Sequence, residues 1–184
     1  MNVDEARALM HEWTASDSLR THMECVAACM EAYAGKHEPR EKDRWVIAGL
    51  LHDFDYERHP SLQEHPKVGV EHLRETTDLD DEVLTAILGH NEATGVPRES
   101  IMARCLFAVD ELSGFIVACA KVRPNGIADM QAKSVKKKLK DKAFAAAVSR
   151  EDIVRGIEEL GVDQTEHIQV CIDAIRQEAS RLAL

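Results

Sequence analysis

Apolar residues recur every three or four positions along most of this chain, and short polar segments separate the apolar stretches. Such spacing places the apolar side chains of a stretch on one face of a helix. The pattern predicts helices within residues 16–36, 41–54, 67–75, 78–91, 98–122, 133–148, 149–161 and 163–184. No segment alternates as a β-strand does, and no internal repeat is present. The sequence therefore predicts an all-α fold, a single-domain bundle of roughly seven or eight helices that spans residues 1–184.

Capping and breaking residues predict where several of these helices begin and end. Gly35 follows the apolar stripe of the first predicted helix and is expected to end it. Pro66 is expected to occupy the first position of the third helix, which makes His65 the cap of that helix. Asp78 or Asp80 is expected to cap the fourth helix by accepting backbone N–H bonds.

The composition is that of an ordinary soluble globular chain. Apolar residues make up 45% and charged residues 30% of the 184 residues, and proline, glycine and aromatic residues are few. No apolar run approaches the roughly 18 residues of a membrane span. The N-terminal residues lack the basic and apolar regions of a signal peptide. We therefore expect a cytoplasmic protein without a membrane partner.

The cysteines indicate the cellular compartment, and the net charge limits the classes of partner that the chain can bind. All five cysteines lie within apolar stretches, at positions 25, 29, 105, 119 and 171, which is typical of core residues in a reducing compartment. The net charge of −10 argues against a nucleic-acid partner, because phosphate binding depends on positive charge. An anionic substrate would have to be met by a local basic cluster or by metal. Nothing in the pattern indicates an oligomeric state.

His22 lies inside the apolar stripe of the first predicted helix, between Leu19 and Val26. A buried imidazole must have its ring nitrogens hydrogen-bonded or bound to an ion, because an unsatisfied polar group costs about 1–3 kcal/mol. His22 is therefore either a core histidine bonded to a backbone carbonyl or a metal ligand. A thiolate zinc site at Cys25 and Cys29 is disfavoured, because the chain has no second cysteine pair.

His52 and Asp53 end a strongly apolar predicted helix, in the sequence AGLLHDFDYERHP. That helix is too hydrophobic to lie on the surface, so both side chains are expected to emerge inside the bundle. Neighbouring side chains at a helix end can converge on an ion just beyond it. Asp55 follows two residues later, and it is either an acceptor that orients a ligand imidazole or a solvated acid at the helix end.

Asp110 is flanked by apolar residues on both sides, in the sequence CLFAVDELSGFIVACA. An ionised carboxylate is rarely buried without a partner, because desolvation disfavours its charge. A salt bridge to Arg44 or Arg104 would provide that partner. A bound cation would do the same.

Two further histidines, His65 and His90, are expected at helix ends. Together with the residues above they provide imidazoles and carboxylates, a donor set that suits transition metals. Six ligands exceed the need of one tetrahedral ion, whereas two ions that share a bridging carboxylate would use them all. The candidate ligands are His22, His52, Asp53, His65, His90 and Asp110. The histidines at positions 11, 37, 59, 72 and 167 lie among charged neighbours or on exposed-looking faces, and we leave them outside the site.

These motifs carry a resemblance to a known family. His22, the HD dipeptide at 52 and 53, and Asp110 in a later helix resemble the HD-domain superfamily of metal-dependent phosphohydrolases. Segments such as LLHDFDYERHP, AILGHN and AVDELSGFI make nearly the whole chain similar to an uncharacterised bacterial group of predicted HD-superfamily hydrolases. The resemblance implies that these four residues are the core metal ligands.

The sequences EHP at His65 and LGH at His90 resemble the branch of that superfamily that carries two metals. This resemblance implies that Asp53 bridges the ions and that His65 and His90 complete the second ion's ligands. The chain departs from the branch at one position. Many two-metal relatives have a lysine that faces a substrate phosphate where this chain has Tyr56.

The resemblance implies hydrolysis of a phosphoester or phosphoanhydride in a small phosphorylated metabolite, with a nucleotide as the expected class, by a water activated by metal. Asp53 and Asp55 are the candidate catalytic carboxylates. Imidazole and carboxylate ligands without thiolate favour iron or manganese, with zinc, magnesium and nickel as alternatives. Lys121 and Arg123 are the candidate contacts for the charge of the substrate, although about 15 Å of helix separates them from Asp110. A basic face of lysines at 133, 136, 137 and 140 could serve instead or could simply be solvated.

Two other functions are compatible with the same ligands. A mixed-valence di-iron centre in this superfamily can use dioxygen to cleave a substrate bond, and no residue here excludes that chemistry. A metal-stabilised or degenerate sensor or scaffold without catalysis is the second alternative. The full ligand set disfavours the degenerate version, because unpaired buried imidazoles and carboxylates destabilise a fold.

Overall fold

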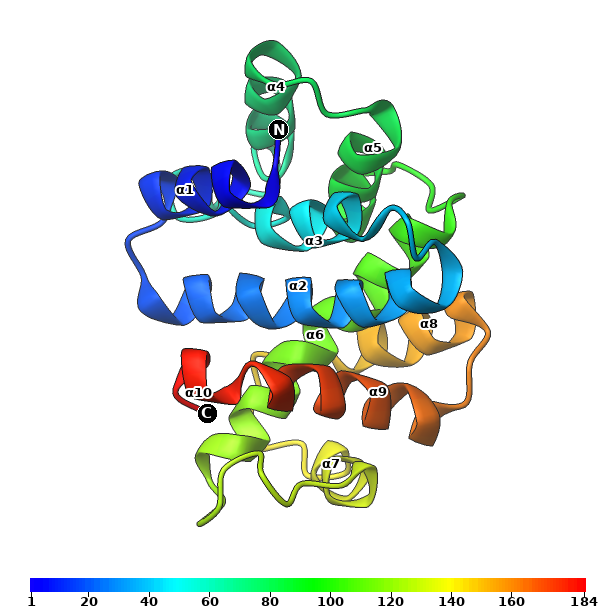
Figure 1. Cartoon of the computed structure of the whole chain (residues 1–184). Coiled ribbons are helices and arrows are strands. Elements are labelled where there is room, and N and C mark those ends of the chain that lie inside the picture. The colour runs from blue at the N-terminus through cyan, green and yellow to red at the C-terminus, as the bar shows by residue number, and fades with distance from the viewer.

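The computed structural model describes all 184 residues, and every regular element in it is a helix (Figure 1). The elements are α1 (Val3–Trp13), α2 (Asp17–His37), α3 (Lys42–Leu51), α4 (Lys67–Thr76), α5 (Asp81–His90), the 3₁₀ helix η1 (Glu92–Thr94), α6 (Ile101–Lys121), α7 (Ala132–Leu139), α8 (Arg150–Leu160), α9 (Gln164–Gln177) and α10 (Ala179–Leu182). The all-α prediction is confirmed. The predicted number of helices was too low, because α1 was missed and the last predicted helix is divided into α9 and α10.

Two of the predicted helix ends differ from the structure. α2 continues past Gly35 to His37, since a glycine permits a helix end without requiring one and α2 packs along α3 and α9. Pro66, rather than His65, is the N-cap residue of α4. The predicted cap of α5 is confirmed, because the side chain of Asp80 accepts the backbone N–H groups of Glu82 and Val83.

The two 21-residue helices, α2 and α6, form the centre of the molecule (Figure 1). α2 packs against α3, α6 and α9, and α6 packs against α5 and α8. Glycine allows a close approach between α2 and α3: a Cβ atom on Gly49 would lie 2.6 Å from the Cα atom of Ala27. The short distance between α2 and α3 brings the end of α3 beside the first turns of α2. This packing positions His22 of α2 beside His52, the residue that follows α3.

The core contains the five cysteines, all of them buried and none in a disulfide, as predicted. It also contains His167, which was expected on an exposed face and is fully buried. The Nε2–H group of His167 donates to the carbonyl of Ala108 at 3.0 Å, and Nδ1 accepts from the Tyr33 hydroxyl at 2.5 Å. Burial lowers the pKa of His167, which favours the neutral ring. No helix has the length and apolarity needed to cross a membrane.

Candidate metal centre

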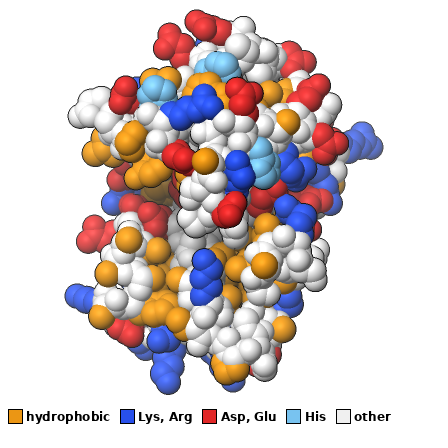
Figure 2. Space-filling view, turned by 90° about the vertical axis from the view of Figure 1, so that its left-hand side faces the viewer, with side chains coloured by type: hydrophobic (Ala, Val, Ile, Leu, Met, Phe, Trp, Pro, Cys, Tyr) orange, Lys and Arg blue, Asp and Glu red, His pale blue; other side chains and the backbone are white.

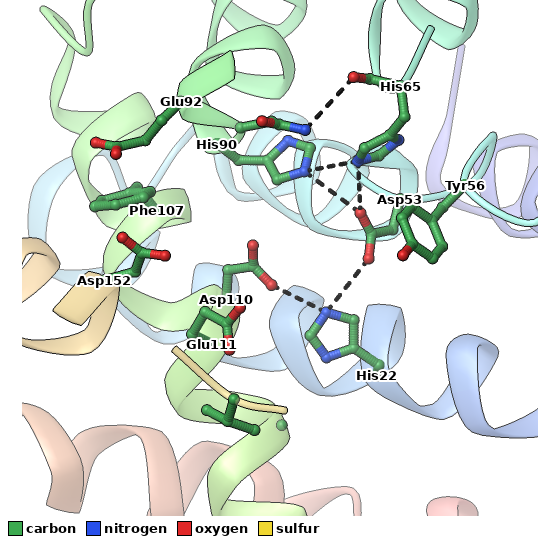
Figure 3. Close-up of a pocket in the computed structure, with 13 residues that line it drawn as sticks. His22, Asp53, Tyr56, His65, His90, Glu92, Phe107, Asp110, Glu111 and Asp152 are labelled. Atoms are coloured by element: carbon green, nitrogen blue, oxygen red, sulfur yellow. Dashed lines mark hydrogen bonds and ion pairs between the residues drawn. The ribbon is translucent and has the colours of Figure 1, made fainter. Parts of the chain in front are cut away.

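Side chains from α2, from α6 and from the residues that follow α3 meet in a first group of potential metal ligands, called group 1. α2 provides His22, the residue after α3 is His52, and α6 provides Asp110. His22 Nε2 lies 3.2 Å from His52 Nε2 and 3.0 Å from Asp110 Oδ1 (Figure 3). Asp53 Oδ2 completes the group, at 3.7 Å from His22 Nε2 and 3.6 Å from His52 Nε2. In group 1, the carboxylates of Asp53 and Asp110 therefore both lie beside the imidazoles of His22 and His52.

A second group, called group 2, forms around the other oxygen of Asp53. His65, from the loop before α4, places Nε2 at 3.2 Å from Asp53 Oδ1. His90, the last residue of α5, places Nε2 at 3.3 Å from the same oxygen. The two Nε2 atoms are 3.2 Å apart. Asp53 thus faces group 1 with Oδ2 and group 2 with Oδ1, which is the geometry of a bridging carboxylate.

Hydrogen bonds at Nδ1 orient the imidazoles. His52 Nδ1–H donates to the carbonyl of Gly49 at 2.8 Å, and His90 Nδ1–H donates to the carbonyl of Ile87 at 2.6 Å. Both carbonyls lie in the last turn of a helix, where backbone acceptors lack helical partners. The chain therefore uses two helix ends to hold these rings with Nε2 directed at Asp53.

His65 is oriented by a buried carboxylate instead of a carbonyl. Its Nδ1–H group donates to Asp55 Oδ1 at 2.7 Å, and the backbone N–H of Gly69 donates to Asp55 Oδ2 at 2.8 Å. Asp55 is fully buried and does not line the cavity described below. Asp55 is therefore placed as the acceptor that orients the imidazole of His65. This is one of the two roles considered from the sequence, the other being a solvated acid at the helix end.

Two imidazole nitrogens and one carboxylate oxygen converge in group 2. The Nδ1–H group of His65 donates to Asp55 and that of His90 donates to a carbonyl, so Nε2 of each ring faces the other ring and Asp53 Oδ1. Such an arrangement is repulsive unless a positive charge lies within it. Ligand atoms about 2.0–2.2 Å from a common ion lie roughly 3–3.5 Å apart. The distances in group 2 fall within this range, and those in group 1 reach 3.7 Å. These residues fit divalent transition-metal ions.

The charges around the site favour a cation in the same way. Burial lowers the pKa of His52, but Asp53 and Asp110 outweigh that effect and raise it to about 9. Burial also lowers the pKa of His65, and Asp53 and Asp55 raise it to about 9. Burial acts in the opposite direction on the carboxyls of Asp53 and Asp110, yet the neighbouring histidines hold both pKa values well below the usual range.

The structure decides between the alternatives left open by the sequence for His22 and Asp110. The two arginines considered as partners of Asp110 are engaged elsewhere. Arg44 binds Asp80 at 2.9 Å, and Arg104 donates to backbone carbonyls. Asp110 instead contacts His22 and His52, at 3.0 and 3.5 Å. His22 is therefore not a core histidine bonded to a carbonyl.

A cavity of about 470 Å³ opens onto both groups. The lining residues are His22, Asp53, Tyr56, His65, His90, Asn91, Glu92, Phe107, Asp110, Glu111, Gly114, Val148 and Asp152. Apart from the histidines, every charged residue in this lining is acidic. The molecule is hollowed on the face seen in Figure 2, and acidic side chains gather beside that hollow.

The structure does not bring Lys121 and Arg123 to this cavity. Neither residue lines it, and Arg123 donates to Asp129 at 2.6 Å. α6 runs on as a regular helix from Asp110 to Lys121, and the turn after it does not fold back to the site. The lysines of α7 are also absent from the lining.

Sequence reasoning missed three acids in the cavity lining: Glu92, Glu111 and Asp152. Glu111 could have been suspected because it follows Asp110. Glu92 and Asp152 belong to η1 and α8, and no local pattern connects them with the histidines. Burial and the charge of Asp110 raise the pKa of Glu111 to about 7, although the backbone N–H of Ser149 donates to its carboxylate at 3.0 Å.

Asp55→Ala is expected to weaken the affinity for one ion about 10- to 100-fold, because His65 loses the acceptor that orients it. The affinity for the other ion should be unchanged, since group 1 does not contact Asp55. Competition with a chromophoric chelator measures both affinities. Gly69→Ala should act in the same direction, because its Cβ atom would lie 2.8 Å from Asp55 Oδ2. Unchanged affinity for both ions in folded Asp55→Ala protein would contradict this role.

Comparison with protein families gives one match: a model of the HD domain family matches residues 19–114. The matched segment contains every residue of groups 1 and 2. Comparison with curated proteins and with solved structures gives no match.

Proposed function

This chain belongs to the HD domain family, and from that premise we propose that it is a phosphohydrolase that uses two divalent metal ions. Group 1 would hold one ion and group 2 the other, with Asp53 shared between them. The observation that carries the proposal is the convergence of imidazole nitrogens on both oxygens of Asp53, those of His22 and His52 on Oδ2 and those of His65 and His90 on Oδ1. Such buried groups are stable together when they bind a cation.

Bound divalent ions would lower the pKa of a coordinated water toward neutrality and would neutralise charge on phosphoryl oxygens. The residues of the chain determine where the ions, and therefore the activated water, would lie. Asp53 keeps the two groups at a fixed separation, and the bonds at Nδ1 keep His52, His65 and His90 in the orientation needed for binding. The mixed imidazole and carboxylate donors favour iron or manganese.

The proposed substrate is a small phosphorylated metabolite, and the nucleotide expected from the sequence is one member of that class. A cavity of about 470 Å³ is of the size that binds small molecules. Since no lysine or arginine lines it, neutralisation of the phosphoryl charge would depend on the ions. Tyr56 lies at the cavity with 45% of its surface exposed, and its ring is nearly perpendicular to that of His65, at 5.1 Å between ring centroids. It is placed to contact the part of a substrate that leaves the cavity.

A metal and substrate panel tests the proposal. Protein stripped of metal by a chelator and reloaded in turn with manganese, iron, zinc or magnesium is assayed for phosphate release from nucleotides, sugar phosphates and other phosphomonoesters. We expect at least one pair of metal and substrate to exceed the stripped protein by about a hundredfold or more. Asp110→Ala protein, purified identically, controls for contaminating phosphatases.

Two results would contradict the proposal. One is the absence of phosphate release from every ester with every metal. The other is turnover that occurs only with iron and dioxygen, which would indicate oxidative cleavage on the same ligands.

A further inference from the structure

Three acidic side chains form one wall of the cavity, called the acidic wall: Glu92, Glu111 and Asp152. In Figure 3 they lie on the α6 and α8 side of the cavity, across from His65 and Tyr56. None of them belongs to group 1 or group 2. The acidic wall therefore faces whatever part of a substrate extends away from the metal ligands.

The negative charge of the acidic wall is neutralised at one end only. Glu92 contacts Arg98 at 3.3 Å and also pairs with Arg155. Asp152 lies 3.9 Å from Arg155, a weak contact at the rim. Glu111 has no cationic side chain within salt-bridge distance, and the only hydrogen bond to its carboxylate comes from the backbone N–H of Ser149. A cationic group on a ligand would be the close partner that Glu111 lacks.

The acidic wall lines the same cavity as His65 and His90 of group 2. His65 and His90 are more than nine-tenths buried, and both place Nε2 beside Asp53 Oδ1 at the cavity. Buried imidazoles and a carboxylate that converge in this way are not a feature of a solvated acidic patch, because burying such groups costs free energy unless they bind a cation. The acidic wall thus belongs to a cavity that is built to receive a ligand.

The chemistry of a fitting substrate follows from these charges. Two ions can neutralise one phosphoryl group, but the further phosphates of a nucleoside di- or triphosphate would face Glu111 and Asp152, and like charges at close range repel. An ammonium group would instead pair with these carboxylates. We propose that the substrate is a phosphomonoester whose organic part carries an ammonium group, bound by Glu111 and Asp152 while the phosphoryl group lies beside Asp53. This inference rests on the proposed function.

The experiment compares two esters that differ only in that group: 3-aminopropyl phosphate and propyl phosphate. With metal-loaded protein we expect kcat/KM for the aminopropyl ester to exceed that for the propyl ester about tenfold or more, as a charge-assisted hydrogen bond predicts. Asp152→Asn and Glu111→Gln should each bring this ratio toward one, chiefly by raising KM for the aminopropyl ester. Both amides keep the size of the side chain, and the amide oxygen introduced at position 111 can still accept from the backbone N–H of Ser149.

Glu151→Gln is the matched control, because it removes one negative charge from the same turn of α8 as Asp152 without lining the cavity. It should leave the ratio unchanged. A ratio near one in the unmodified protein, a preference for nucleoside triphosphates, or an equal fall in the ratio in all three variants would overturn the inference.

A binding measurement separates this inference from the proposed function. If neither ester is hydrolysed, the proposed function fails, yet calorimetric titration of the metal-loaded protein with each ester still tests the inference. Tighter binding of the aminopropyl ester by about tenfold, lost in Asp152→Asn, supports it. Equal affinity for the two esters contradicts it.

Discussion

Asp53→Ala is expected to lose both metal ions and to lower hydrolysis at least about a thousandfold. Asp53 is the residue that contacts both groups, since Oδ2 lies 3.7 Å from His22 Nε2 and Oδ1 lies 3.2 Å from His65 Nε2. Without it, group 2 would retain two neutral imidazoles and no carboxylate. Group 1 would retain Asp110 as its single anionic ligand, and the charge of a divalent ion would be poorly balanced.

Elemental analysis of purified Asp53→Ala protein, together with its rate of phosphate release, measures this effect. Circular dichroism shows whether the variant folds. Asp43→Ala is the matched control, because Asp43 is an exposed carboxylate in the first turn of α3, the helix that leads to Asp53. The control should keep both ions and full activity. A folded Asp53→Ala protein that still holds two ions per chain would contradict the assignment of Asp53 as the bridge.

His90→Ala is expected to reduce the metal content from two ions to one and to abolish most of the activity. His90 belongs to group 2 alone, where its Nε2 lies 3.3 Å from Asp53 Oδ1. Its removal leaves group 1 complete. His22→Ala should remove the other ion, because His22 belongs to group 1, where it contacts Asp110 and Asp53 Oδ2. Its only contact with group 2 is the shared residue Asp53. The two variants should therefore have the same metal content and lack different ions.

Anomalous scattering from crystals of the two metal-loaded variants identifies which position is filled in each. His11→Ala controls for the loss of a histidine as such, since His11 is exposed on α1 and belongs to neither group. Loss of both ions from His90→Ala would show that the groups are not independent. A single ion in the unmodified protein, unaffected by His90→Ala, would reduce the centre to group 1.

Most helices could be predicted because their signals are local. The serine and aspartate caps of α2 and α5 act on backbone groups two or three residues away. α1 also has such signals, a capping box between Asn2 and Glu5 and buried residues Ala6 and Met10 one turn apart, but it was not recognised. The end of α2 could not be predicted from Gly35, because tertiary packing extends that helix.

The donor types of the site could be predicted from the cost of burying charge. Asp110 within an apolar helix and His22 within an apolar stripe both required partners, and they are 3.0 Å apart in the structure. The same reasoning did not place Lys121 or Arg123, because helical spacing gives a distance along α6 but not the direction of the chain after it. It also did not find Asp152, which reaches the cavity only through the packing of α8 on α6.

The amino-acid sequence alone determined the helices, their apolar faces and the presence of buried imidazoles and carboxylates that need a cation. These features depend on residues within a few turns of each other and on the free energy of taking polar groups out of water. Only the tertiary structure decided that Asp53 presents one oxygen to each group, that His65 is oriented by Asp55, and that the opposite wall of the cavity is acidic. Contacts between distant helices settle such features, because the direction of a side chain in space depends on how its helix packs.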